Sequence, residues 1–259
     1  MKLGIIGGIH EDVVRLKEAL AVLKERGCSV LACLGDMTGY GVMYYGYSDT
    51  RDAHACVQLV KENCRYAVVG NHDLFAIRKI PRQTPFQYPT NWYELDVATK
   101  EKIANDAVYL YQDDLPAALT EDDSDYLAGL PECLVARIDG IGILISHYAY
   151  PNLVGDGVEF DPSENDGIRQ HFRFMTEQGC SLAVFNHDLC DGVRIFSESA
   201  IQELPFGKYA LPAGKVALNG SWVANSTSPN GVLILDPATR HVEAIPLNTP
   251  VHKPAMAPR

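Results

Sequence analysis

The 259-residue chain is long enough to bury one substantial core, and with 47% hydrophobic and 21% charged residues it has an ordinary globular composition. Its net charge of −11 disfavours long-range attraction to nucleic acid or anionic lipid, so action on phosphates would require local cations, most simply metals. No apolar run approaches the roughly 18 residues that span a bilayer, and MKLGIIGG is too short for a signal peptide. Seven cysteines without CxxC spacing favour the reducing cytoplasm over a disulfide framework.

The N-terminal part alternates between apolar strands and amphipathic helices. Strands are predicted over residues 2–6, 29–34 and 65–69, and helices over 11–26 and 51–64. In the first helix one face carries Val13, Leu16, Leu20 and Leu23, and Gly27 ends the helix. This rhythm predicts a parallel sheet, in which functional groups gather at the carboxyl ends of the strands.

The rest of the chain is predicted to complete one domain over residues 1–247. Residues 74–132 are less regular, with helices near 93–104 and 122–130, and are interpreted as a partly helical excursion that covers the site. Further strands are predicted over 133–138, 141–146 and 181–185, with a helix over 162–178. The ending is strand-rich (193–196, 215–219, 231–236, 241–246), which predicts a second sheet packed on the first. Residues 248–259 are predicted to form a flexible tail.

Polar side chains follow five of these strands, in loops that the strands hold rigidly. They are His10, Asp36, the triplet Asn71-His72-Asp73, His147 and His187. Each is a metal-ligand type or a proton donor. A single histidine in such a place is more often structural, but five such placements in order favour a functional site.

The ordered set resembles the calcineurin-like metallophosphoesterases, whose motifs are D-x-H, G-D, G-N-H-D/E, a lone H and G-H-x-H. The counterparts here are Gly8-Ile9-His10, Gly35-Asp36, Gly70-Asn71-His72-Asp73, His147 and Asn186-His187-Asp188-Leu189. The stretch GDMTGYG (35–41) is similar to the GDxxGYG of small bacterial members, and residues 218–236 are similar to their closing strands. The resemblance covers about residues 2–247 and implies an α/β fold, a four-layer αββα sandwich of two mixed sheets flanked by helices.

The resemblance also implies a two-cation site that hydrolyses phosphate esters with metal-activated water. The implied ligands are His10, Asp36, Asn71, His147 and His187, and the implied cation is divalent Mn, Fe, Zn or Ni. His72 corresponds to the acid that protonates the leaving oxygen, and Asp73 to the acidic neighbour that orients it.

Two positions depart from the family pattern, and both concern the same cation. Gly8 stands where the first aspartate belongs and Leu189 where the last histidine belongs, so one cation keeps only His10 and a share of Asp36. The other cation retains its complete set. Replacement ligands are conceivable from a nearby group: Glu11, Asp12, Asp188, Cys190 and Asp191. Neighbouring side chains in a strand-exit loop generally point elsewhere, so we expect one strong metal site and one doubtful site.

The segment YGVMYYGY (40–47) directly follows Asp36 and allows two interpretations. Tyr44, Tyr45 or Tyr47 can stack on a base or an aryl leaving group, or these tyrosines can pack a glycine-rich loop against the sheet.

Two functional hypotheses from different classes follow. The first is a cytoplasmic phosphoesterase acting on a small phosphorylated substrate, a monoester or a diester. The second is a catalytically degenerate relative that binds a metal or a phosphorylated ligand as a regulator or scaffold. The intact GNHD motif favours the enzyme, whereas Gly8 and Leu189 favour the scaffold. Binding to polymeric nucleic acid is disfavoured by the net charge.

Overall fold

The computed structural model describes residues 1–42, 44–158, 161–162, 167–224 and 229–250. Two six-stranded sheets and a two-stranded ribbon make up the β-structure of these residues. The ribbon pairs β3 (Tyr40–Gly41) with β5 (Asp114–Leu115) in antiparallel orientation.

The first sheet is mixed, because β1, β2 and β4 run parallel to one another while β13 pairs with β1 in antiparallel orientation. Its strands in spatial order are β11 (Gly207–Ala210), β14 (His241–Pro246), β13 (Gly231–Asp236), β1 (Leu3–Ile6), β2 (Val30–Cys33) and β4 (Tyr66–Ala67).

The second sheet is also mixed, with parallel pairing between β12 and β8 and between β8 and β7. Its strands in spatial order are β10 (Ile201–Leu204), β9 (Val193–Ser197), β12 (Val216–Gly220), β8 (Leu182–Phe185), β7 (Ile141–Ser146) and β6 (Cys133–Ile138).

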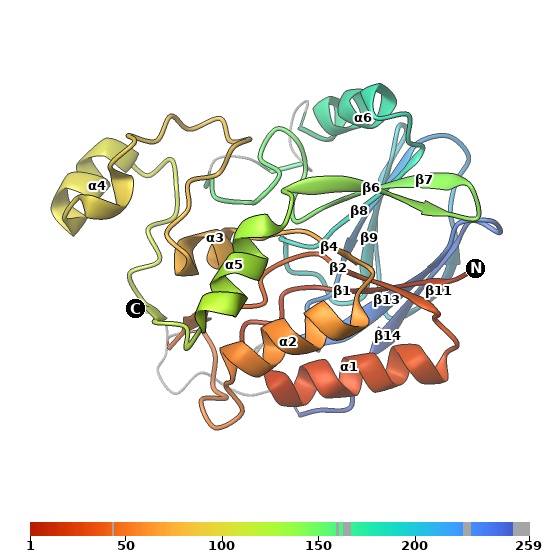
Figure 1. Cartoon of the computed structure of the whole chain (residues 1–259). Coiled ribbons are helices and arrows are strands. Elements are labelled where there is room, and N and C mark those ends of the chain that lie inside the picture. Colours follow the sequence, from red (N-terminus) through yellow and green to blue (C-terminus); the bar gives the residue numbers. More distant parts are fainter. Residues whose placement is uncertain (43, 159–160, 163–166, 225–228, 251–259) are drawn as a thin grey trace.

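Helices cover the outer faces of both sheets (Figure 1). The helical elements are α1 (Val13–Glu25), α2 (Ala53–Asn63), α3 (Asn71–Ala76), η1 (Trp92–Glu94), α4 (Val97–Ala104), α5 (Glu121–Gly129) and α6 (Gly167–Glu177). Helices α1 and α2 lie against the first sheet, α5 packs on α2, and α6 covers the second sheet. Asp12 begins α1 because its carboxylate accepts hydrogen bonds from the amides of Val14 and Arg15.

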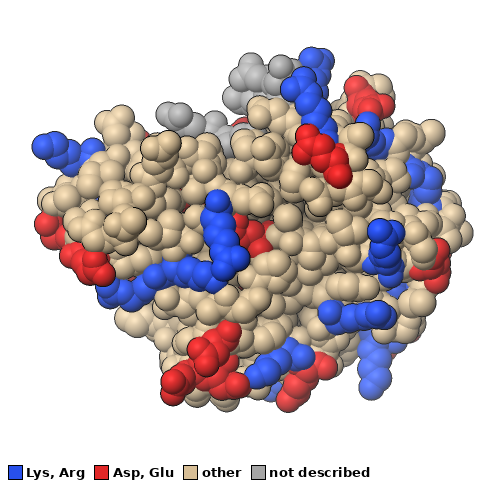
Figure 2. Space-filling model, turned by 45° about the horizontal axis from the view of Figure 1, so that its top comes forward, with Lys and Arg blue, Asp and Glu red and all other residues tan. Residues whose placement is uncertain are grey.

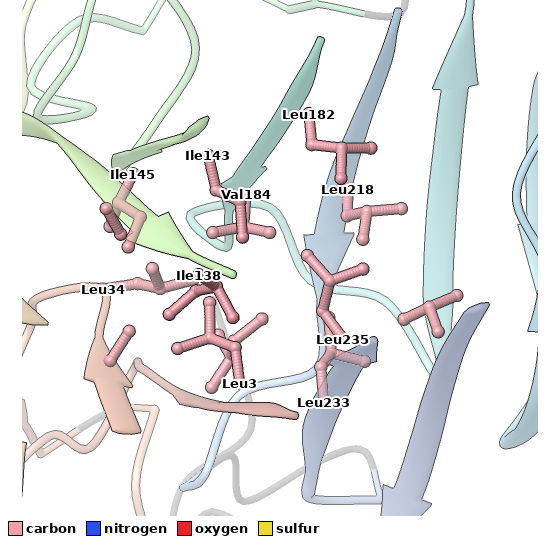
Figure 3. Close-up of a cluster of buried hydrophobic side chains, with 14 of the residues drawn as sticks. Leu3, Leu34, Ile138, Ile143, Ile145, Leu182, Val184, Leu218, Leu233 and Leu235 are labelled. Atoms are coloured by element: carbon pink, nitrogen blue, oxygen red, sulfur yellow. The ribbon is translucent and has the colours of Figure 1, made fainter. Parts of the chain in front are cut away.

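Three apolar layers join these elements into four stacked layers. Between the sheets, Leu3 and Leu34 meet Ile143, Val184 and others of the cluster in Figure 3. The remaining two layers lie between a sheet and its helices. On the outer face of the first sheet the buried side chains include Leu16, Leu23, Val57, Val60 and Ile234. On the outer face of the second they include Phe172, Met175, Leu144, Phe185 and Phe196. The αββα sandwich expected from the sequence is therefore confirmed.

The strand-rich ending is distributed differently from the expectation of a second sheet. Strands β11, β13 and β14 extend the first sheet beside β1, and β9, β10 and β12 join β6, β7 and β8 in the second. Four short elements were not expected: α3, the β3–β5 ribbon, β10 and β11. The two strands β10 and β11 have mostly exposed or half-buried side chains, so their sequences carry little alternation of apolar and polar residues.

Residues 74–132 contain η1, α4, β5 and α5, and this segment reaches the site through Tyr111 and Asp114. The beginning of the expected tail is bound to α1, since the amides of Asn248 and Thr249 donate to the Glu18 carboxylate. The remainder of that expected tail, residues 251–259, lies outside the described residues, as do residues 163–166 of the helix expected over 162–178.

Both acidic and basic side chains lie on the face shown in Figure 2, where one connected run of basic side chains extends from the left edge toward an acidic group near the centre. Among the described helices, none has the length and apolar character needed to cross a membrane.

Candidate metal and catalytic site

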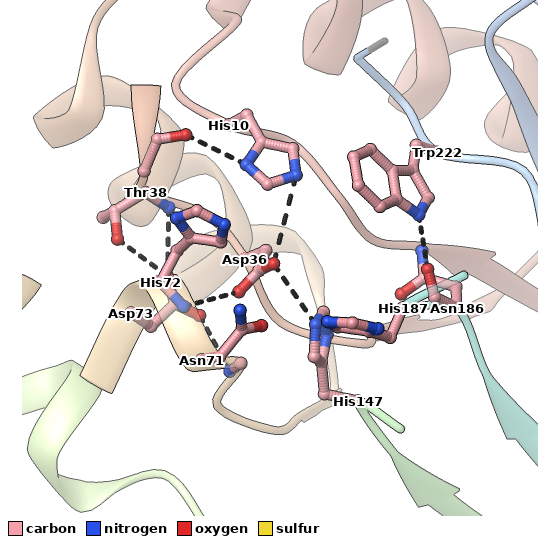
Figure 4. A network of polar contacts seen from close by, with 12 residues as sticks. His10, Asp36, Thr38, Asn71, His72, Asp73, His147, Asn186, His187 and Trp222 are labelled. Carbon is pink, nitrogen blue, oxygen red and sulfur yellow. Dashed lines mark hydrogen bonds and ion pairs between the residues drawn. The ribbon is translucent and has the colours of Figure 1, made fainter. Parts of the chain in front are cut away.

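The strand-end residues meet at one end of the sandwich (Figure 4). His10 follows β1, Asp36 follows β2, and Asn71 begins the short helix α3 after β4. His147 follows β7 and His187 follows β8, both in the second sheet. The two sheets therefore present their carboxyl-end loops to a common centre, as the parallel pairs on each sheet require.

Asp36 occupies the middle of this centre and is 2% exposed. Its backbone is left-handed (φ 53°), a conformation that costs a non-glycine residue about 1–2 kcal/mol. The Asp36 Oδ1 atom accepts a hydrogen bond from the His72 amide at 3.0 Å. Gly70 is required beside it, because a Cβ at position 70 would overlap Asp36 Oδ1. The loop geometry thus directs the other carboxylate oxygen toward the surrounding imidazoles.

Three donor atoms form a small triangle on one side of Asp36. The Asn71 Oδ1 position lies 3.2 Å from Asp36 Oδ2 and 3.0 Å from His147 Nε2, and those two atoms are 3.2 Å apart. Two ligands at about 2.1 Å from one ion, separated by about 90–109°, would be about 3.0–3.4 Å apart. The triangle therefore has the size of one face of a metal coordination sphere. We call Asp36, Asn71 and His147 the donor half of the site.

The orientation of the Asn71 amide depends on whether positive charge is present. Its oxygen faces Asp36 Oδ2 and the Val154 carbonyl at 3.1 Å, while its Nδ2 donates to the Tyr111 hydroxyl at 2.9 Å. Oxygen atoms at these separations repel one another unless a cation lies among them. Turned by 180°, the amide would instead donate to the same three neighbours. The donor set thus fits a divalent cation. The Tyr111 hydroxyl can pair with the amide in either orientation, accepting from its nitrogen or donating to its oxygen.

His147 is positioned by a hydrogen bond between its Nδ1 atom and the Leu34 carbonyl, at 2.6 Å. Nδ1 is the donor to that carbonyl, so Nε2 faces Asp36. Burial lowers the pKa of His147, but the Asp36 carboxylate raises it more, and the net shift is upward. Cation binding must displace the proton that Asp36 otherwise favours on Nε2, so cation affinity will increase with pH.

His187 lies beside the donor half. Its ring is 5.3 Å from the His147 ring, in an edge-to-face arrangement, and 4.5 Å from the Tyr148 ring. Its Nδ1 atom is buried without a hydrogen-bond partner and lies 3.6 Å from the nearest Asp188 carboxylate oxygen. A buried nitrogen with no hydrogen bond costs free energy, and a cation would satisfy it.

His72 is held by Asp114 and not by Asp73. The His72 Nδ1 atom lies 2.6 Å from Asp114 Oδ2 in strand β5. The Asp73 carboxylate instead accepts from the Thr38 amide at 3.0 Å and the Gly70 amide at 3.1 Å, so it joins two of the site loops. The expectation that Asp73 orients His72 is therefore corrected: helix α3 turns the Asp73 side chain inward, away from the imidazole.

The charge on His72 is set by the same neighbours. Burial lowers its pKa, but Asp36 and the hydrogen-bonded Asp114 raise it, and the pKa lies at about 9. With Nδ1 committed to Asp114, the other nitrogen, Nε2, is the one that can transfer a proton to a bound ligand. This is the arrangement that a general acid requires.

The other side of Asp36 is aromatic. The His10 ring stacks on Tyr45 at 4.8 Å and lies 4.8 Å from the Trp222 indole. Its Nδ1 atom contacts the Gly39 carbonyl at 3.0 Å, while its buried Nε2 has no hydrogen-bond partner and lies 3.9 Å from Asp36 Oδ2. Burial lowers the pKa of His10 to about 4, so the ring is neutral. We call His10, Tyr45 and Trp222 the aromatic half.

His10, Asp36 and His72 each offer one possible ligand atom, all within 4.8 Å of one another. As an imidazolium, His72 has no lone pair to give, so ligation and the acid role exclude each other. Any cation on the aromatic half would therefore have only His10 and the shared Asp36.

Trp222 fills the space where the family's first aspartate would lie. A Cβ added at Gly8, whose φ is +57°, would be 2.6 Å from Trp222 Cγ and 2.9 Å from Trp222 Cβ. The indole Nε1 donates to the Asn186 carbonyl at 2.5 Å, which fixes the ring beside Gly8. An aspartate at position 8 is thus sterically excluded unless Trp222 moves.

The conceivable replacement ligands are engaged elsewhere or point outward. The Glu11 carboxylate pairs with Arg51, and that of Asp12 caps α1 and pairs with Arg15. Cys190 is buried against the Asn219 carbonyl. Asp191 is exposed. Asp188 is half-buried, with one carboxylate oxygen 3.6 Å from His187 Nδ1 and the other 3.7 Å from the Arg194 guanidinium. Leu189 is 47% exposed.

Three residues of the site were not anticipated from the sequence. Asp114 and Tyr111 come from the irregular excursion, where no motif marks them. Trp222 lies after β12, and its only signal was its place in the segment 218–236. A glycine in place of a metal ligand, together with a tryptophan in a segment near the predicted metals, is the pattern that could have indicated that an indole ring occupies the place of that ligand.

The family model described as calcineurin-like phosphoesterase matches residues 1–191. An uncharacterized protein of Methanocaldococcus jannaschii is 28% identical over 120 residues, and this alignment spans 46% of the chain and 44% of that protein. Trp222 lies beyond the part that the family model matches.

Two solved structures share the fold along most of their length. One is a metallophosphoesterase from Sphaerobacter thermophilus, with a TM-score of 0.66 and 19% identity over 96% of this chain and 89% of that one. The other is a hypothetical protein from Pyrococcus horikoshii OT3, with a TM-score of 0.57 and 13% sequence identity. That match covers 96% of this chain and 88% of the other.

Proposed function

This chain belongs to the calcineurin-like phosphoesterase family, and from that premise we propose that it hydrolyses a phosphate monoester or diester with a single well-held divalent cation. The cation would be Mn, Fe, Zn or Ni, and four residues would hold it: Asp36, Asn71, His147 and His187. When bound, such a cation supplies Lewis-acid charge that lowers the pKa of a water and stabilises phosphoryl oxygens.

His72 performs the proton transfer. The oxygen of a water forms a bond to phosphorus, the bond from phosphorus to the leaving oxygen breaks, and His72 gives its Nε2 proton to that oxygen. The proton lost by the water passes to solvent. Asp114 keeps the imidazole aimed through its hydrogen bond to Nδ1, and Asp73 holds the loops that carry Thr38 and Gly70.

The observation that carries this proposal is the environment of the Asn71 amide. Its oxygen position lies 3.0–3.2 Å from His147 Nε2, the Val154 carbonyl and Asp36 Oδ2, while Tyr111 accepts from its nitrogen. Turning the amide would satisfy these atoms without a cation, so the support for a cation is the spacing of the donor atoms of Asn71, Asp36 and His147, which lie 3.0–3.2 Å apart as ligands of one ion do.

The second candidate function is a catalytically inactive member that binds a metal or a phosphorylated ligand as a regulator. Trp222 supports it, because the indole fills the place of a ligand that two-cation members use. The His72–Asp114 pair favours the enzyme, since a binding protein needs no protonated imidazole aimed at its ligand.

The test is to count metals per chain in the purified protein and to assay p-nitrophenyl phosphate and bis(p-nitrophenyl) phosphate with Mn, Ni, Zn and Fe. We expect about one tightly bound ion and turnover that is lost on chelation. In Asn71→Leu, which removes the amide oxygen, both ion and turnover should be lost. The matched control is Asn63→Leu, the same change on the exposed surface of α2, which should leave both unchanged.

Turnover equal to wild type in Asn71→Leu would overturn the proposed cation site. Binding of one ion without turnover of either ester under any of the four metals would favour the regulator over the enzyme.

We also propose that the substrate is a small phosphorylated molecule and that the protein works in the cytoplasm. The net charge of −11 disfavours a polyanionic partner. All seven cysteines are free thiols, four of them buried, which suits a reducing compartment.

A further inference from the structure

Arg51 lies between two segments of the site that are far apart in the sequence. Its side chain is 20% exposed, and its Nε atom donates to the Glu11 carboxylate in the loop after β1. Its Nη2 atom donates to the Pro116 carbonyl at 2.5 Å and to the Leu115 carbonyl at 3.4 Å, at the end of β5. One guanidinium therefore fastens the excursion to the loop that carries His10.

The strand that Arg51 fastens is the one that carries Asp114. Strand β5 has two residues, Asp114 and Leu115, which pair with Gly41 and Tyr40 of β3. This ribbon belongs to neither six-stranded sheet, and an isolated pair of short strands is only marginally stable in water. The Arg51 guanidinium contacts both strands, because it lies 5.4 Å from the Tyr40 ring centroid and donates to the two carbonyls that follow Asp114. Arg51 therefore supplies contacts that the ribbon needs to keep Asp114 in place.

The Glu11 carboxylate connects Arg51 to a second contact of His72. Glu11 is fully buried, and its Oε1 atom accepts from the Gly39 amide at 3.2 Å. A Cβ added at Gly39 would overlap the Nδ1 and Cβ atoms of His72, so the Gly39 backbone packs directly on this side chain. Asp114 Oδ2 lies 2.6 Å from the same Nδ1 atom. Both of these groups at the Nδ1 edge of the imidazole are therefore connected to Arg51.

We propose that Arg51 is a positioning residue for the general acid. By joining Glu11 to the end of β5, it holds the Asp114 carboxylate against the His72 imidazole and keeps the ring aimed at the leaving oxygen. This inference rests on the phosphoesterase function proposed above and adds the residue that holds its acid in place. Arginine suits the role because its planar guanidinium presents several donors in a fixed geometry, so it can satisfy a carboxylate and two carbonyls at once.

The test variant removes the ion pair as a unit. Changing Arg51 alone would leave the buried Glu11 carboxylate without its guanidinium partner, so both are replaced, as Glu11→Gln/Arg51→Met. Glutamine can still accept from the Gly39 amide, whereas methionine cannot donate to the β5 carbonyls. The control is Arg26→Met/Glu243→Gln, the same changes at a more exposed ion pair between the end of α1 and β14. Urea denaturation and metal content check that both variants fold and keep the ion.

The hydrogen bond that Arg51 protects is observed by proton NMR of the Zn-loaded protein. A proton held between His72 Nδ1 and a carboxylate oxygen 2.6 Å away resonates downfield of the backbone amides, and its loss in His72→Asn assigns it. In Glu11→Gln/Arg51→Met we expect the signal to broaden or vanish, because the Asp114 carboxylate is held less firmly and the proton exchanges with water. The signal should persist in the control. An unchanged signal in the test variant would overturn the proposal, whatever the turnover.

Turnover tests what the positioning does for the reaction. Phenyl phosphate and p-nitrophenyl phosphate are of similar size, but the phenolate leaving group needs a proton more than nitrophenolate does. In Glu11→Gln/Arg51→Met we expect kcat to fall about 10- to 100-fold for phenyl phosphate and much less for p-nitrophenyl phosphate, with KM unchanged. Adding Asp114→Asn should hardly increase the loss, since both changes remove the same contact.

The failures of the two proposals can be told apart. Equal losses for the two esters, or a loss that adds in full to that of Asp114→Asn, would overturn the positioning role and leave the phosphoesterase standing. Absence of turnover by the wild type with every cation would overturn the phosphoesterase, and with it the catalytic role of Arg51, even where the NMR signal shows that Arg51 holds Asp114.

Discussion

The donor half and the aromatic half flank the same carboxylate, Asp36, but they satisfy their buried polar atoms differently. In the donor half, three ligand-type atoms lie 3.0–3.2 Å apart and the Asn71 oxygen faces other oxygens. In the aromatic half, the His10 ring is enclosed by Tyr45 and Trp222, and Nε2 is its one unsatisfied atom.

The difference does not come from the scaffold. His10 and Asp36 both occupy left-handed backbone after parallel strands, and the amides of Ile9 and His10 both donate to the Asp36 carbonyl, at 2.7 and 3.0 Å. The loop that would carry the first aspartate is therefore intact. At position 8 a glycine takes the place of a charged ligand, and the Trp222 ring occupies the space which that ligand would need. A cation site can therefore be lost while the surrounding fold stays the same.

The largest expected effect comes from removing a ligand atom from the donor half. His147→Ala removes the nitrogen that lies 3.2 Å from Asp36 Oδ2, and we expect loss of the tightly bound ion and a fall in kcat/KM of about 10⁴-fold or more, because a Lewis acid supplies several kcal/mol. Metal content by mass spectrometry and p-nitrophenyl phosphate turnover measure both. His241→Ala, on β14, is the control. Unchanged metal content would contradict the assignment of the donor half.

The next effect separates proton transfer from cation binding. His72→Asn should lower kcat about 10²- to 10⁴-fold, with the smallest loss for nitrophenyl esters, whose leaving group needs little protonation. The bound ion should remain. Asp114→Asn should give a smaller loss, because the imidazole stays but loses the carboxylate 2.6 Å from Nδ1. If His72→Asn released the ion as readily as His147→Ala, His72 would be a ligand and not the acid.

A smaller effect tests whether the Trp222 indole is what excludes a second cation from the aromatic half. Gly8→Asp should destabilise the protein by about 1–3 kcal/mol, since its Cβ would lie 2.6 Å from Trp222 Cγ. In Gly8→Asp/Trp222→Ala the two changes should compensate in part, and metal content should rise toward two ions per chain. Chemical denaturation of both single variants and the double variant gives the coupling free energy. Additive losses, with one ion throughout, would show that the indole is not what excludes a second cation.

The fold, and the strand-end loops that bring Asp36, Asn71 and His147 together, could be predicted because both follow from local patterns. Strands 133–138 and 141–146 and the closing strands are bounded by clear turn residues, and the GNHD motif fixes Asn71 and His72 in one loop. Strands β10 and β11 were missed because their side chains are mostly exposed or half-buried, so burial leaves no pattern in their sequence.

The partners of the site residues could not be predicted, since they depend on contacts between distant segments. Asp114 reaches His72 from 42 residues away through a two-residue strand, and Tyr111 reaches Asn71 from 40 residues away. Asp73 adjoins His72 in sequence, yet helix α3 places its carboxylate on Thr38 and Gly70. Sequence proximity predicted the wrong carboxylate as the partner of His72, because consecutive residues of a helix point about 100° apart.

The smallest expected effect concerns the contact that keeps the donor half ready for a cation. The Tyr111 hydroxyl accepts from Asn71 Nδ2 at 2.9 Å while the amide oxygen faces Asp36 and His147, and it can donate to the amide oxygen when the amide is turned. Without that hydroxyl the amide loses the hydrogen bond that it makes in either orientation, so Asn71 is held less firmly where the cation binds. Tyr111→Phe should therefore weaken cation affinity about 10-fold, within the range that residues supporting metal ligands usually contribute.

The matched control for Tyr111→Phe is Tyr88→Phe, which removes a hydroxyl bonded to Asp156 in the same excursion without touching the amide. Competition with a chelator of known affinity measures both variants. A tenfold loss in Tyr111→Phe alone means that the donor half is oriented by the excursion, and hence that the segment over the site helps to form it. Equal affinity in both variants would mean that Asp36 and His147 set the amide orientation without Tyr111.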